Sequence, residues 1–476
     1  MRYRNTLMCL ILLCSNILIG QTSKGKEFWF GFMENLNIDT LEVYICAELA
    51  ATGVVSMPAL GWSSNFNVSA NSTISVGVPH IIAMANGVGV MDLGVLVKSD
   101  VDVTVYAMNY KEATSDASII LPKKALGYKY MVSSYNPQAG VFISPSEFMI
   151  VASEDNTTIK ITPKSDIIGG PTAGTLYTIV LNKGQLYQGQ SNFDLTGTLI
   201  ESVNSAQECK PIAVFSGNVC VNVGGCQYCD HLYEAMLPIP IWGKEYIAVP
   251  FKSRLGDEFS VMASEDNTVV DVDGSIVNLN SGDSNFYFSD TEHYISSSNP
   301  ICFSQFCRGN MCDNLEGDPL MIVHSSLDQT LNDIYFNAFT SAIITGYYLN
   351  VVTASSGTPL LLDGVDISSQ LTTLPTNPSY SFAKVDISSG NHNLSSTEGF
   401  LAFVYGFGGR ESYGYSAGNS LREFKDDYEL VNLTQSDSFI CVLDVLQFNE
   451  SLDSGVLSFS WDFGNNTNSA SSAPQV

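Results

Sequence analysis

Short alternating runs of apolar and polar residues dominate the chain. Thr157–Thr162 and Thr268–Asp273 alternate β-branched with polar residues, so each puts one face on a core and the other toward water. Pro211–Ser216 and Pro300–Phe306 are apolar runs typical of a fully buried strand opened by a proline. No stretch of about ten or more residues has helical spacing with caps. The pattern predicts an all-β protein with antiparallel strands and little helix.

Part of this pattern is repeated. Glu147–Thr157 recurs as Glu258–Thr268, and both copies contain Ala-Ser-Glu-Asp-Asn-Thr. The Ser-Glu-Asp-Asn segment is turn chemistry, because Asp and Asn bond their own backbone and tolerate left-handed conformations. We therefore expect a hairpin in each copy. A shared Gly-containing element precedes the copies and also follows the N-terminus: Gly25–Phe28, Gly127–Tyr130 and Gly243–Tyr246. A divergent fourth copy is Asp333–Tyr335 with Tyr347–Ala354.

These repeats predict four modules, near residues 25–122, 123–238, 239–326 and 327–418. About eight short strands in each module can form one β-sandwich or two propeller blades. The unequal lengths favour tandem antiparallel β-sandwich-like modules. A β-propeller built from the same repeats is the alternative, in which the strand near residues 25–32 pairs with the last module and closes a ring.

Both ends of the chain differ from the modules. Two arginines precede the apolar run Leu7–Ile19, so residues 1–20 are predicted to be a signal peptide. After residue 420 a charged linker leads into Ser458–Asn465, which resembles the Trp-Asp-Phe-Gly-Asp-Gly signature of polycystic-kidney-disease repeats. Residues 421–476 are therefore predicted to be a linker and part of one such sandwich.

Charge restricts the partners. The net charge is −27, and no block of Lys or Arg follows the signal segment. A phosphate backbone would be repelled, so nucleic acid and anionic membranes are excluded as partners. No second run of about 18 apolar residues occurs, which argues against membrane insertion of the mature chain.

The cysteines suggest an oxidising compartment. Nine of the eleven follow the signal segment. Aligning the modules sets Cys220 against Cys307 and Cys229 against Cys312. A disulfide in each module, Cys220–Cys229 and Cys307–Cys312, is therefore predicted. The pairing of the other five stays open: Cys46, Cys209, Cys226, Cys302 and Cys441.

The sequence gives weaker support for a metal site or a catalytic site. Cys226, Cys229 and His231 have ligand types that suit zinc, but the aligned module has Asn314 in place of the histidine. Glu154-Asp155 and Glu265-Asp266 are paired carboxylates, yet both sit in the duplicated turns. Calcium is the one cofactor that such Asp/Asn turns suit, although no twelve-residue calcium loop is present. No nucleophile elbow or phosphate loop is visible, so we predict that the protein is not an enzyme.

One segment carries a family resemblance. Cys229–Pro238, preceded by Phe215–Asn218, resembles the Cys-Asp-His-Leu-x-Glu-Gln-Leu-Pro stretch of IgG Fc-binding proteins, with Ala235-Met236 where Gln-Leu is usual. Val404–Phe407 and Ser412–Tyr415 extend the resemblance, which covers residues 21–420. It implies a secreted or cell-surface protein. A predicted signal that ends before Gln, and the Trp-Asp-Phe-Gly segment, favour a bacterial surface protein of the Bacteroidota type.

The leading hypothesis is a non-catalytic adhesion or glycoprotein-binding module. Repeated sandwiches display many polar loops, and Tyr413 and Tyr415 are expected to be exposed contact residues. The expected partner is an extracellular glycoprotein or glycan, mucin-like or immunoglobulin. The alternatives are a secreted carbohydrate-active enzyme or its accessory domain, and a structural stalk.

Overall fold

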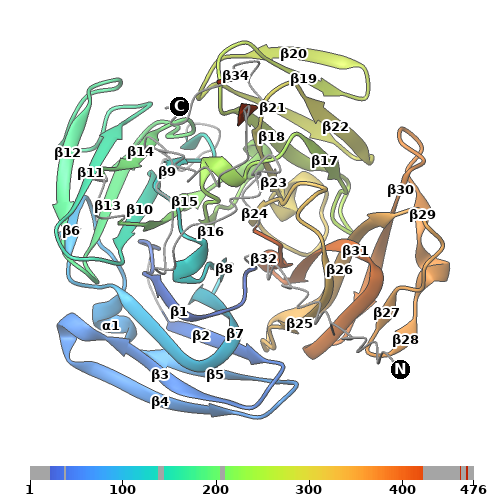
Figure 1. The fold of residues 1–476 in the computed structure, drawn as a ribbon, viewed down its shortest axis with the longest axis horizontal. Coiled ribbons are helices and arrows are strands. Elements are labelled where there is room, and N and C mark those ends of the chain that lie inside the picture. The colour runs from blue at the N-terminus through green and yellow to red at the C-terminus, as the bar shows by residue number, and fades with distance from the viewer. Residues whose placement is uncertain are drawn as a thin grey trace, which may run out of the picture.

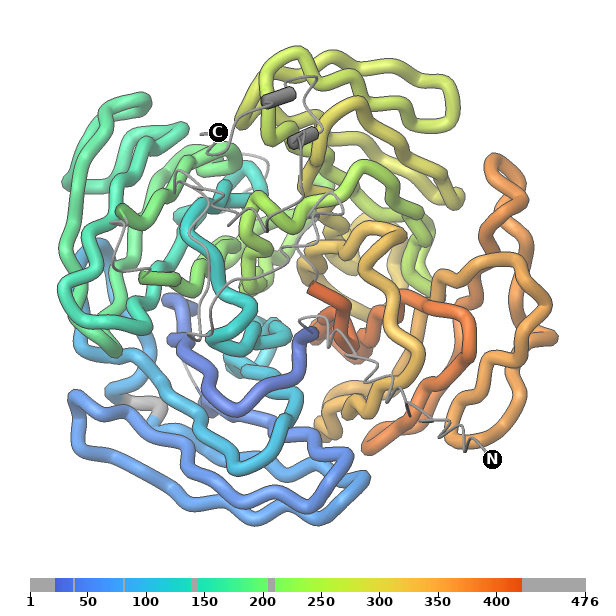
Figure 2. The backbone as a smooth tube through the Cα atoms, viewed as in Figure 1, coloured from blue at the N-terminus to red at the C-terminus, as the bar shows by residue number. Residues whose placement is uncertain are grey.

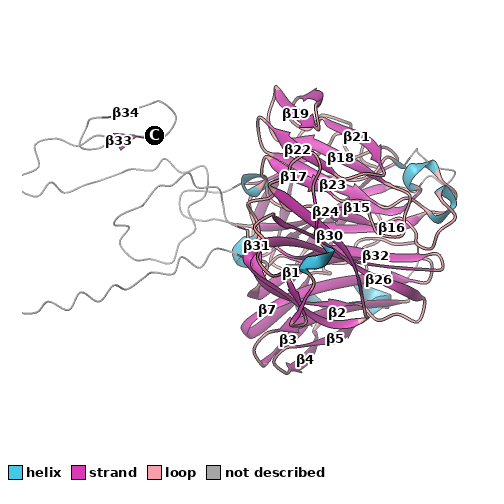
Figure 3. Ribbon diagram, turned by 90° about the vertical axis from the view of Figure 1, so that its right-hand side faces the viewer, coloured by secondary structure: helices cyan, strands magenta, loops and turns pink. Residues whose placement is uncertain are grey.

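The computed structural model describes residues 22–36, 39–137, 144–203 and 210–421, together with the paired strands β33 (Trp461–Asp462) and β34 (Asn468–Ser469). The predicted signal peptide and most of the predicted sandwich after residue 420 lie outside these residues. The strands form four lobes around a common centre (Figure 1). In the side view, strands cross the short dimension of this body (Figure 3).

Each lobe is built from antiparallel strands. Lobe 1 comprises β1 (Gly25–Phe30), β2 (Thr40–Ala47), β3 (Ala51–Met57), β4 (Trp62–Val68), β5 (Ser72–Val78), β7 (Val95–Lys111) and β8 (Thr114–Ile120). Lobe 2 comprises β9 (Lys129–Met131), β10 (Ser146–Ala152), β11 (Thr157–Thr162), β12 (Tyr177–Leu181), β13 (Leu186–Ser191), β14 (Leu199–Ser202), β15 (Ile212–Val221) and β16 (Asp230–Ala235). Strand β6 (Gly89–Met91) precedes β7 in the chain but pairs with β13, so it is an edge strand of lobe 2.

Lobe 3 repeats the sheet order of lobe 2, whereas the strands of lobe 4 form one sheet. Lobe 3 comprises β17 (Glu245–Ala248), β18 (Asp257–Ala263), β19 (Thr268–Val272), β20 (Ser275–Leu279), β21 (Ser284–Ser289), β22 (His293–Ser297), β23 (Ile301–Phe306) and β24 (Met321–Val323). Lobe 4 comprises β25 (Leu331–Ala338), β26 (Ile344–Ala354), β27 (Leu361–Leu362), β28 (Val365–Asp366), β29 (Thr372–Thr373), β30 (Tyr380–Ile387), β31 (Gly390–Gly408) and β32 (Glu411–Gly418).

Helix is scarce in the described residues, as the sequence predicts. The α-helix there is α1 (His80–Ala83), and the rest are short 3₁₀ turns: η1 (Pro58–Leu60), η2 (Lys123–Ala125), η4 (Val223–Gly225), η5 (Ile239–Ile241), η6 (Asn310–Cys312) and η7 (Ser368–Gln370). Within the described part of the chain, none of these helices is long and apolar enough to cross a membrane.

The lobes are two-layered, which agrees with the sandwich interpretation. Lobe 3 has one sheet of β17, β22, β19 and β20 and a second of β21, β18, β23 and β24. Phe259 and Phe303 from one sheet and Val270 and Ile295 from the other share a single core. A sheet whose strands alternate apolar and polar side chains buries one face. Two such sheets are therefore needed to enclose a core. Strands β15 and β23, which follow Pro211 and Pro300, are buried throughout.

In lobes 1 and 4 one long strand serves both layers. The first half of β7, residues 95–103, pairs with β1 and β3, whereas its second half pairs with β2 and β8. Strand β31 bends in the same manner, since its first half pairs with β25 and its second half with β26 and β32. A strand that changes sheets turns the corner of a sandwich without a loop.

The repeated Gly-containing element has one local structure in lobes 2 and 3. The Tyr130 hydroxyl accepts a hydrogen bond from Gly127 N–H at 2.7 Å and donates to Ile212 O at 2.8 Å. Tyr246 makes the two equivalent contacts in lobe 3, at 3.1 and 2.7 Å. The buried tyrosine thus ties the first strand of the lobe to its proline-initiated inner strand, and the repetition of the sequence reflects the repetition of this link.

The prediction of a hairpin at each duplicated turn is wrong. The Ser-Glu-Asp-Asn turns join β10 to β11 and β18 to β19, and in each pair the two strands lie in different sheets. Every residue of β10 is buried, whereas β11 alternates between buried and partly exposed positions. A strand covered on both faces belongs to an inner sheet, and an alternating strand belongs to an outer one. The turn therefore carries the chain between layers.

The two ends of the described region meet. Thr22 bridges Ser420, and Ser23 N–H donates to Asn419 O at 3.1 Å. Figure 2 shows the blue start of the described chain beside its red end, near the centre. Strand β1 itself pairs with β7 of its own lobe, not with the last lobe, so the contact that the propeller alternative required is not made by that strand.

The last strand of each lobe lies at the centre, where β8, β16, β24 and β32 converge (Figure 1). Every residue of these strands is buried. The expectation that Tyr413 and Tyr415 are exposed is therefore wrong, since both are 0% exposed in β32. The Tyr415 hydroxyl donates to Asn337 O, and both rings pack against Phe339.

One carboxylate connects all four lobes at this centre. Asp116 in β8 accepts N–H groups from Tyr233 at 3.1 Å, Met321 at 3.3 Å and Gly414 at 3.4 Å, which belong to β16, β24 and β32. It also accepts from Ala117 N–H at 2.9 Å. Burial raises the pKa of Asp116 well above its usual range, and the four N–H donors oppose that shift.

Candidate functional site

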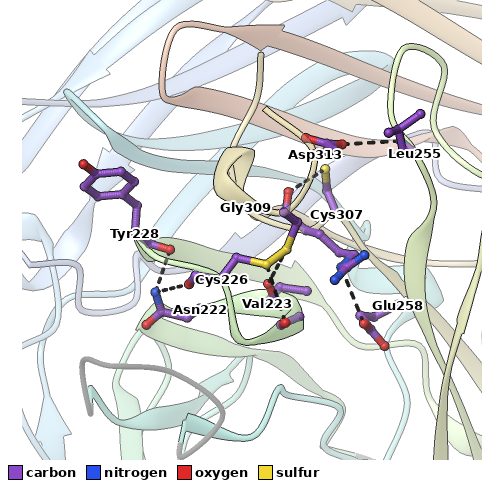
Figure 4. Close-up of a disulfide and its surroundings, with 12 residues drawn as sticks. Asn222, Val223, Cys226, Tyr228, Leu255, Glu258, Cys307, Gly309 and Asp313 are labelled. Atoms are coloured by element: carbon purple, nitrogen blue, oxygen red, sulfur yellow. Dashed lines mark hydrogen bonds and ion pairs between the residues drawn. A yellow bond between two sulfur atoms is a disulfide. The ribbon is translucent and has the colours of Figure 1, made fainter. Parts of the chain in front are cut away.

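Two disulfides brace the loops at one end of the central strands. Cys220 bonds to Cys229, the pair that the sequence predicts, across the loop from β15 to β16. Cys226 of the same loop bonds to Cys312 in lobe 3, with 5.5 Å between their Cα atoms (Figure 4). The second bond therefore joins two lobes.

The predicted Cys307–Cys312 disulfide is wrong. Cys307 is a buried thiol that forms no disulfide with any described residue, and burial raises its pKa. The alignment of the repeats shows which cysteines occupy equivalent positions in two lobes. It does not show which loops of neighbouring lobes face each other. Cys46 and Cys302 are also buried thiols, and burial raises the pKa of each to about 12, so they are poor nucleophiles.

The zinc candidate is not assembled. Cys226 and Cys229 are held in separate disulfides. His231 is buried in β16, where its Nδ1 lies 2.9 Å from Asn218 O and its Nε2 lies 3.2 Å from Asn109 Nδ2. Burial lowers the pKa of His231 to about 4, so it is a neutral core histidine. No group of three or more His, Cys, Asp or Glu among the described residues is arranged to hold a metal ion.

The paired carboxylates belong to structural turns. Asp155 accepts Lys183 N–H at 3.0 Å, and Asp266 accepts Ser281 N–H at the same distance. The following asparagines have φ angles of 52° and 57°. In each turn the next threonine hydroxyl donates to the glutamate carbonyl at 2.7 Å. Two copies with the same bonds in equivalent places indicate a conserved way to turn the chain between layers.

A cavity of about 300 Å³, here called the axial cavity, opens next to the Cys220–Cys229 disulfide. All four lobes contribute to it, through these lining residues: Leu36, Ala113, Thr114, Ser144, Cys220, Tyr228, Cys229, Asp318 and Arg410. A concave site where several structural units meet is the usual place for a ligand. The cavity is small enough for one compact group.

Arg410 lines this cavity, Arg308 contacts the neighbouring loop at Gly224, and Arg254 donates to Arg308 O at 2.7 Å. The described residues contain three arginines, and each lies over an aromatic ring: Arg410 over Tyr228 at 5.1 Å, Arg308 over Phe288 at 4.7 Å and Arg254 over Phe407 at 5.5 Å. Arg254 is buried and forms a two-pronged ion pair with Asp313, at 2.9 and 3.1 Å. Arg410 is exposed.

The loop that carries Tyr228 is in contact with the loop that carries Arg308. A side chain added at Gly224 would meet Arg308 Nε at 2.5 Å, and one added at Gly309 would lie 3.6 Å from Tyr228 O. Exposed apolar side chains lie on these two loops and next to them: Tyr228, Met311, Leu315, Leu255, whose N–H donates to Asp313, and Leu36, which lines the cavity. We call these five residues, with Arg308, Arg410 and the axial cavity, the axial face.

Two buried acids lie beneath the face. Asp318 is 1% exposed, and burial raises its pKa to about 6, against the opposing effects of a hydrogen bond from the Asn310 backbone and of the charges of Arg254 and Arg410. Glu411 accepts Ala113 N–H at 3.0 Å and the Ser115 hydroxyl, and burial raises its pKa to about 7. Glu411 is therefore satisfied by its neighbours, whereas Asp318 faces the cavity.

Sequence reasoning did not identify these residues. The available signal was the scarcity of arginine: only Arg254, Arg308, Arg410 and Arg422 follow the predicted signal peptide. They are far apart in the chain, so only the fold shows that Arg308 and Arg410 lie on one face, with Arg254 buried beside Arg308.

Comparisons with known proteins agree with the resemblance noted from the residues. The family model "IgGFc binding protein" matches residues 116–406. The human protein named IgGFc-binding protein is 26% identical over 239 residues, which cover 48% of this chain and 4% of the human protein. The chain thus spans a small fraction of that relative. An anti-sigma factor domain-containing protein from Clostridium clariflavum matches with a TM-score of 0.13 and 11% identity, over 67% of this chain and 84% of that one. That likeness is too weak to carry an argument. Because the family model covers more than half of the 476 residues, the chain belongs to the IgGFc-binding protein family.

Proposed function

We propose that the protein is a secreted or cell-surface binding module that recognises an extracellular glycoprotein through the axial face. The observation that carries this proposal is that Tyr228 and Arg410 line one cavity, with the partly exposed Arg308 and the exposed Met311 on the adjoining loop. Arginine, tyrosine and methionine are the residue types enriched in the cores of protein interfaces, and the strongest contacts involve arginine and aromatic residues.

Rigidity supports the same proposal. Tyr228 lies between Cys226 and Cys229, and both cysteines are in disulfides. Asn222 Nδ2 donates to Tyr228 O and to Cys226 O, each at 2.7 Å (Figure 4). A side chain that is fixed before binding loses less conformational entropy in the complex. The loop is therefore suited to present a contact residue.

The class of partner follows from charge and from family membership. The net charge of −27 opposes nucleic acid. The name of the human relative refers to the Fc part of immunoglobulin, and an immunoglobulin or a mucin-like glycoprotein is our proposed partner. Adhesion is the role that fits such a module on a bacterial surface.

Surface plasmon resonance with the purified full chain tests this proposal. Immunoglobulin G and a mucin glycoprotein are immobilised separately, and wild type is compared with Arg410→Glu. A central arginine contact typically contributes about 2 kcal/mol or more, so the Kd should rise roughly 30-fold or more. Lys160→Glu, at an exposed position of β11 outside the axial face, is the matched charge reversal and should leave the Kd unchanged. Equal binding by wild type and Arg410→Glu would refute the proposed face.

A hydrolase is the rival function, because an acid with a raised pKa in a cavity is typical of catalytic sites. Asp318 is the one carboxyl among the residues lining the axial cavity. A two-carboxylate mechanism needs a partner for it, and Glu411 is engaged by Ala113 and Ser115. Release of sugar from the mucin by the wild type, and its loss in Asp318→Asn, would favour the hydrolase.

A further inference from the structure

One oxygen of a carboxylate that lines the axial cavity has no hydrogen-bond partner among the described residues. Asp318 is 1% exposed and lines the cavity, and its Oδ1 has no hydrogen-bond partner among the described residues. Buried carboxylate oxygens are nearly always hydrogen-bonded, and each exception requires an explanation. A ligand that brings an O–H or N–H group to this oxygen would satisfy it.

The wall of the cavity offers an aromatic surface with a fixed orientation. The Tyr228 side chain is 39% exposed, and the Arg410 guanidinium lies 5.1 Å from its ring centre. Ala113, Tyr228 and Arg410 all have left-handed backbone, with φ angles of 66°, 73° and 63°. Such conformations are unfavourable for residues other than glycine and are maintained by the surrounding structure, often at binding sites.

The charges at the cavity select against charged ligands. An ammonium group that approached Asp318 would also meet Arg410, and a carboxylate or phosphate that approached Arg410 would meet Asp318. A neutral group with both donors and acceptors avoids either repulsion. It can donate to Asp318 and accept from Arg410 at the same time.

The volume of the cavity and the Tyr228 ring restrict the class of ligand further. The cavity, at about 300 Å³, is at the small end of ligand sites, so it suits one compact ring and not an extended chain. A sugar ring has hydroxyls that both donate and accept, and its C–H face packs on an aromatic ring. A peptide side-chain amide also donates and accepts, but it has no ring face to cover Tyr228.

We propose that the axial cavity binds one neutral sugar ring of the partner's glycan, with the ring against Tyr228, one hydroxyl donating to Asp318 and another accepting from Arg410. This inference deepens the proposed glycoprotein-binding function and rests on it.

Saturation-transfer NMR with the full chain tests the sugar specificity directly. The neutral probes are galactose, mannose and N-acetylglucosamine, and the charged probes are glucosamine and N-acetylneuraminic acid. We expect transfer to at least one neutral probe and not to the charged ones. Transfer to the charged probes alone, or to none of the five, overturns the proposal.

Matched variants locate the binding. Tyr228→Asn removes the ring while keeping a residue that tolerates left-handed backbone, and Tyr228→Phe retains the ring. The first should weaken sugar binding at least tenfold, and the second should bind within about threefold of wild type. Tyr335→Asn, at a half-exposed tyrosine of β25, controls for loss of any surface tyrosine and should bind as wild type. Thermal unfolding confirms that each variant is folded. Unchanged sugar binding by folded Tyr228→Asn overturns the proposal.

A third comparison separates this inference from the proposed function. Surface plasmon resonance is repeated on the mucin before and after enzymatic removal of its glycans. Loss of binding with the glycans supports the sugar site. Binding that survives deglycosylation but is still abolished by Arg410→Glu keeps the axial face as a protein-binding surface and overturns the sugar site. Binding that neither treatment changes overturns both.

Discussion

Replacing Asp116 by alanine should loosen the junction of all four lobes. Its carboxylate accepts backbone N–H groups from β16, β24 and β32 at 3.1 to 3.4 Å and from its own strand at 2.9 Å. The residue is fully buried, so water cannot replace the lost acceptor. Each buried donor left without a partner costs about 1–3 kcal/mol.

The net loss is smaller than the sum of these terms. Removing a buried carboxylate also removes its desolvation cost, and two of the contacts, at 3.3 and 3.4 Å, are long. We therefore expect Asp116→Ala to lower the free energy of unfolding by about 3–5 kcal/mol, which is at the low end of the sum of about 1–3 kcal/mol for each of the four donors. That is a large fraction of the total stability of a typical domain, about 5–15 kcal/mol.

Urea unfolding followed by tryptophan fluorescence measures this change, with linear extrapolation to water. Asp266→Ala is the matched control, because that aspartate is exposed and its side chain accepts one N–H, from Ser281. It should cost less than about 1 kcal/mol. If Asp116→Ala unfolds within about 1 kcal/mol of the control, Asp116 does not hold the lobes together and the reasoning is refuted.

Three further predictions concern other parts of the molecule. Because burial raises the pKa of Glu411 to about 7, its contribution to stability is fully present below the unfolded pKa and is lost as pH rises through about 7. The glutamine in Glu411→Gln does not titrate. Urea unfolding should therefore show that the free energy of unfolding of the variant, relative to wild type, rises by roughly 2–3 kcal/mol between pH 4 and pH 8. A difference between the two proteins that stays constant over this pH range would contradict the pKa shift. Peptide mapping without reductant should recover a peptide pair joined through Cys226 and Cys312. Recovery of alkylated Cys312 after alkylation of the native protein without reductant would disprove that bond. The double variant Glu154→Gln and Glu265→Gln should retain its stability to within about 1 kcal/mol and should still bind glycoprotein, because both glutamates lie in structural turns. If the wild type has hydrolytic activity and this variant loses it, the glutamates have a catalytic role.

Several features of the fold are local and could be predicted from the sequence. Alternation in Thr157–Thr162 places that strand at the surface of a core, since side chains of a strand point to opposite faces in turn. The apolar run after Pro211 becomes β15, which is buried on both faces. Asn156 and Asn267 adopt left-handed backbone in the duplicated turns, as the side-chain chemistry of asparagine favours. Cys220 and Cys229 are close in the chain, and a short loop brings them together.

Other features depend on how distant segments meet, and the pattern of one segment contains no information about them. The sequence predicted a strand at Thr157–Thr162 and a turn before it, but not that β10 and β11 lie in different sheets, because a turn of the same chemistry can join either arrangement. Tyr413 and Tyr415 looked suited to contact a partner, yet convergence of four lobes buries the strand that carries them.

The site shows the same division most clearly. The sequence alone determined an all-β, acidic chain of repeated units, because residue type, spacing and repetition are local properties. The Cys226–Cys312 bond joins two lobes, and Tyr228, Asp318 and Arg410 come from three of them. Only the tertiary structure decided that these residues surround one cavity, because their proximity results from the packing of whole lobes around a buried centre and not from any interaction between neighbours in the chain.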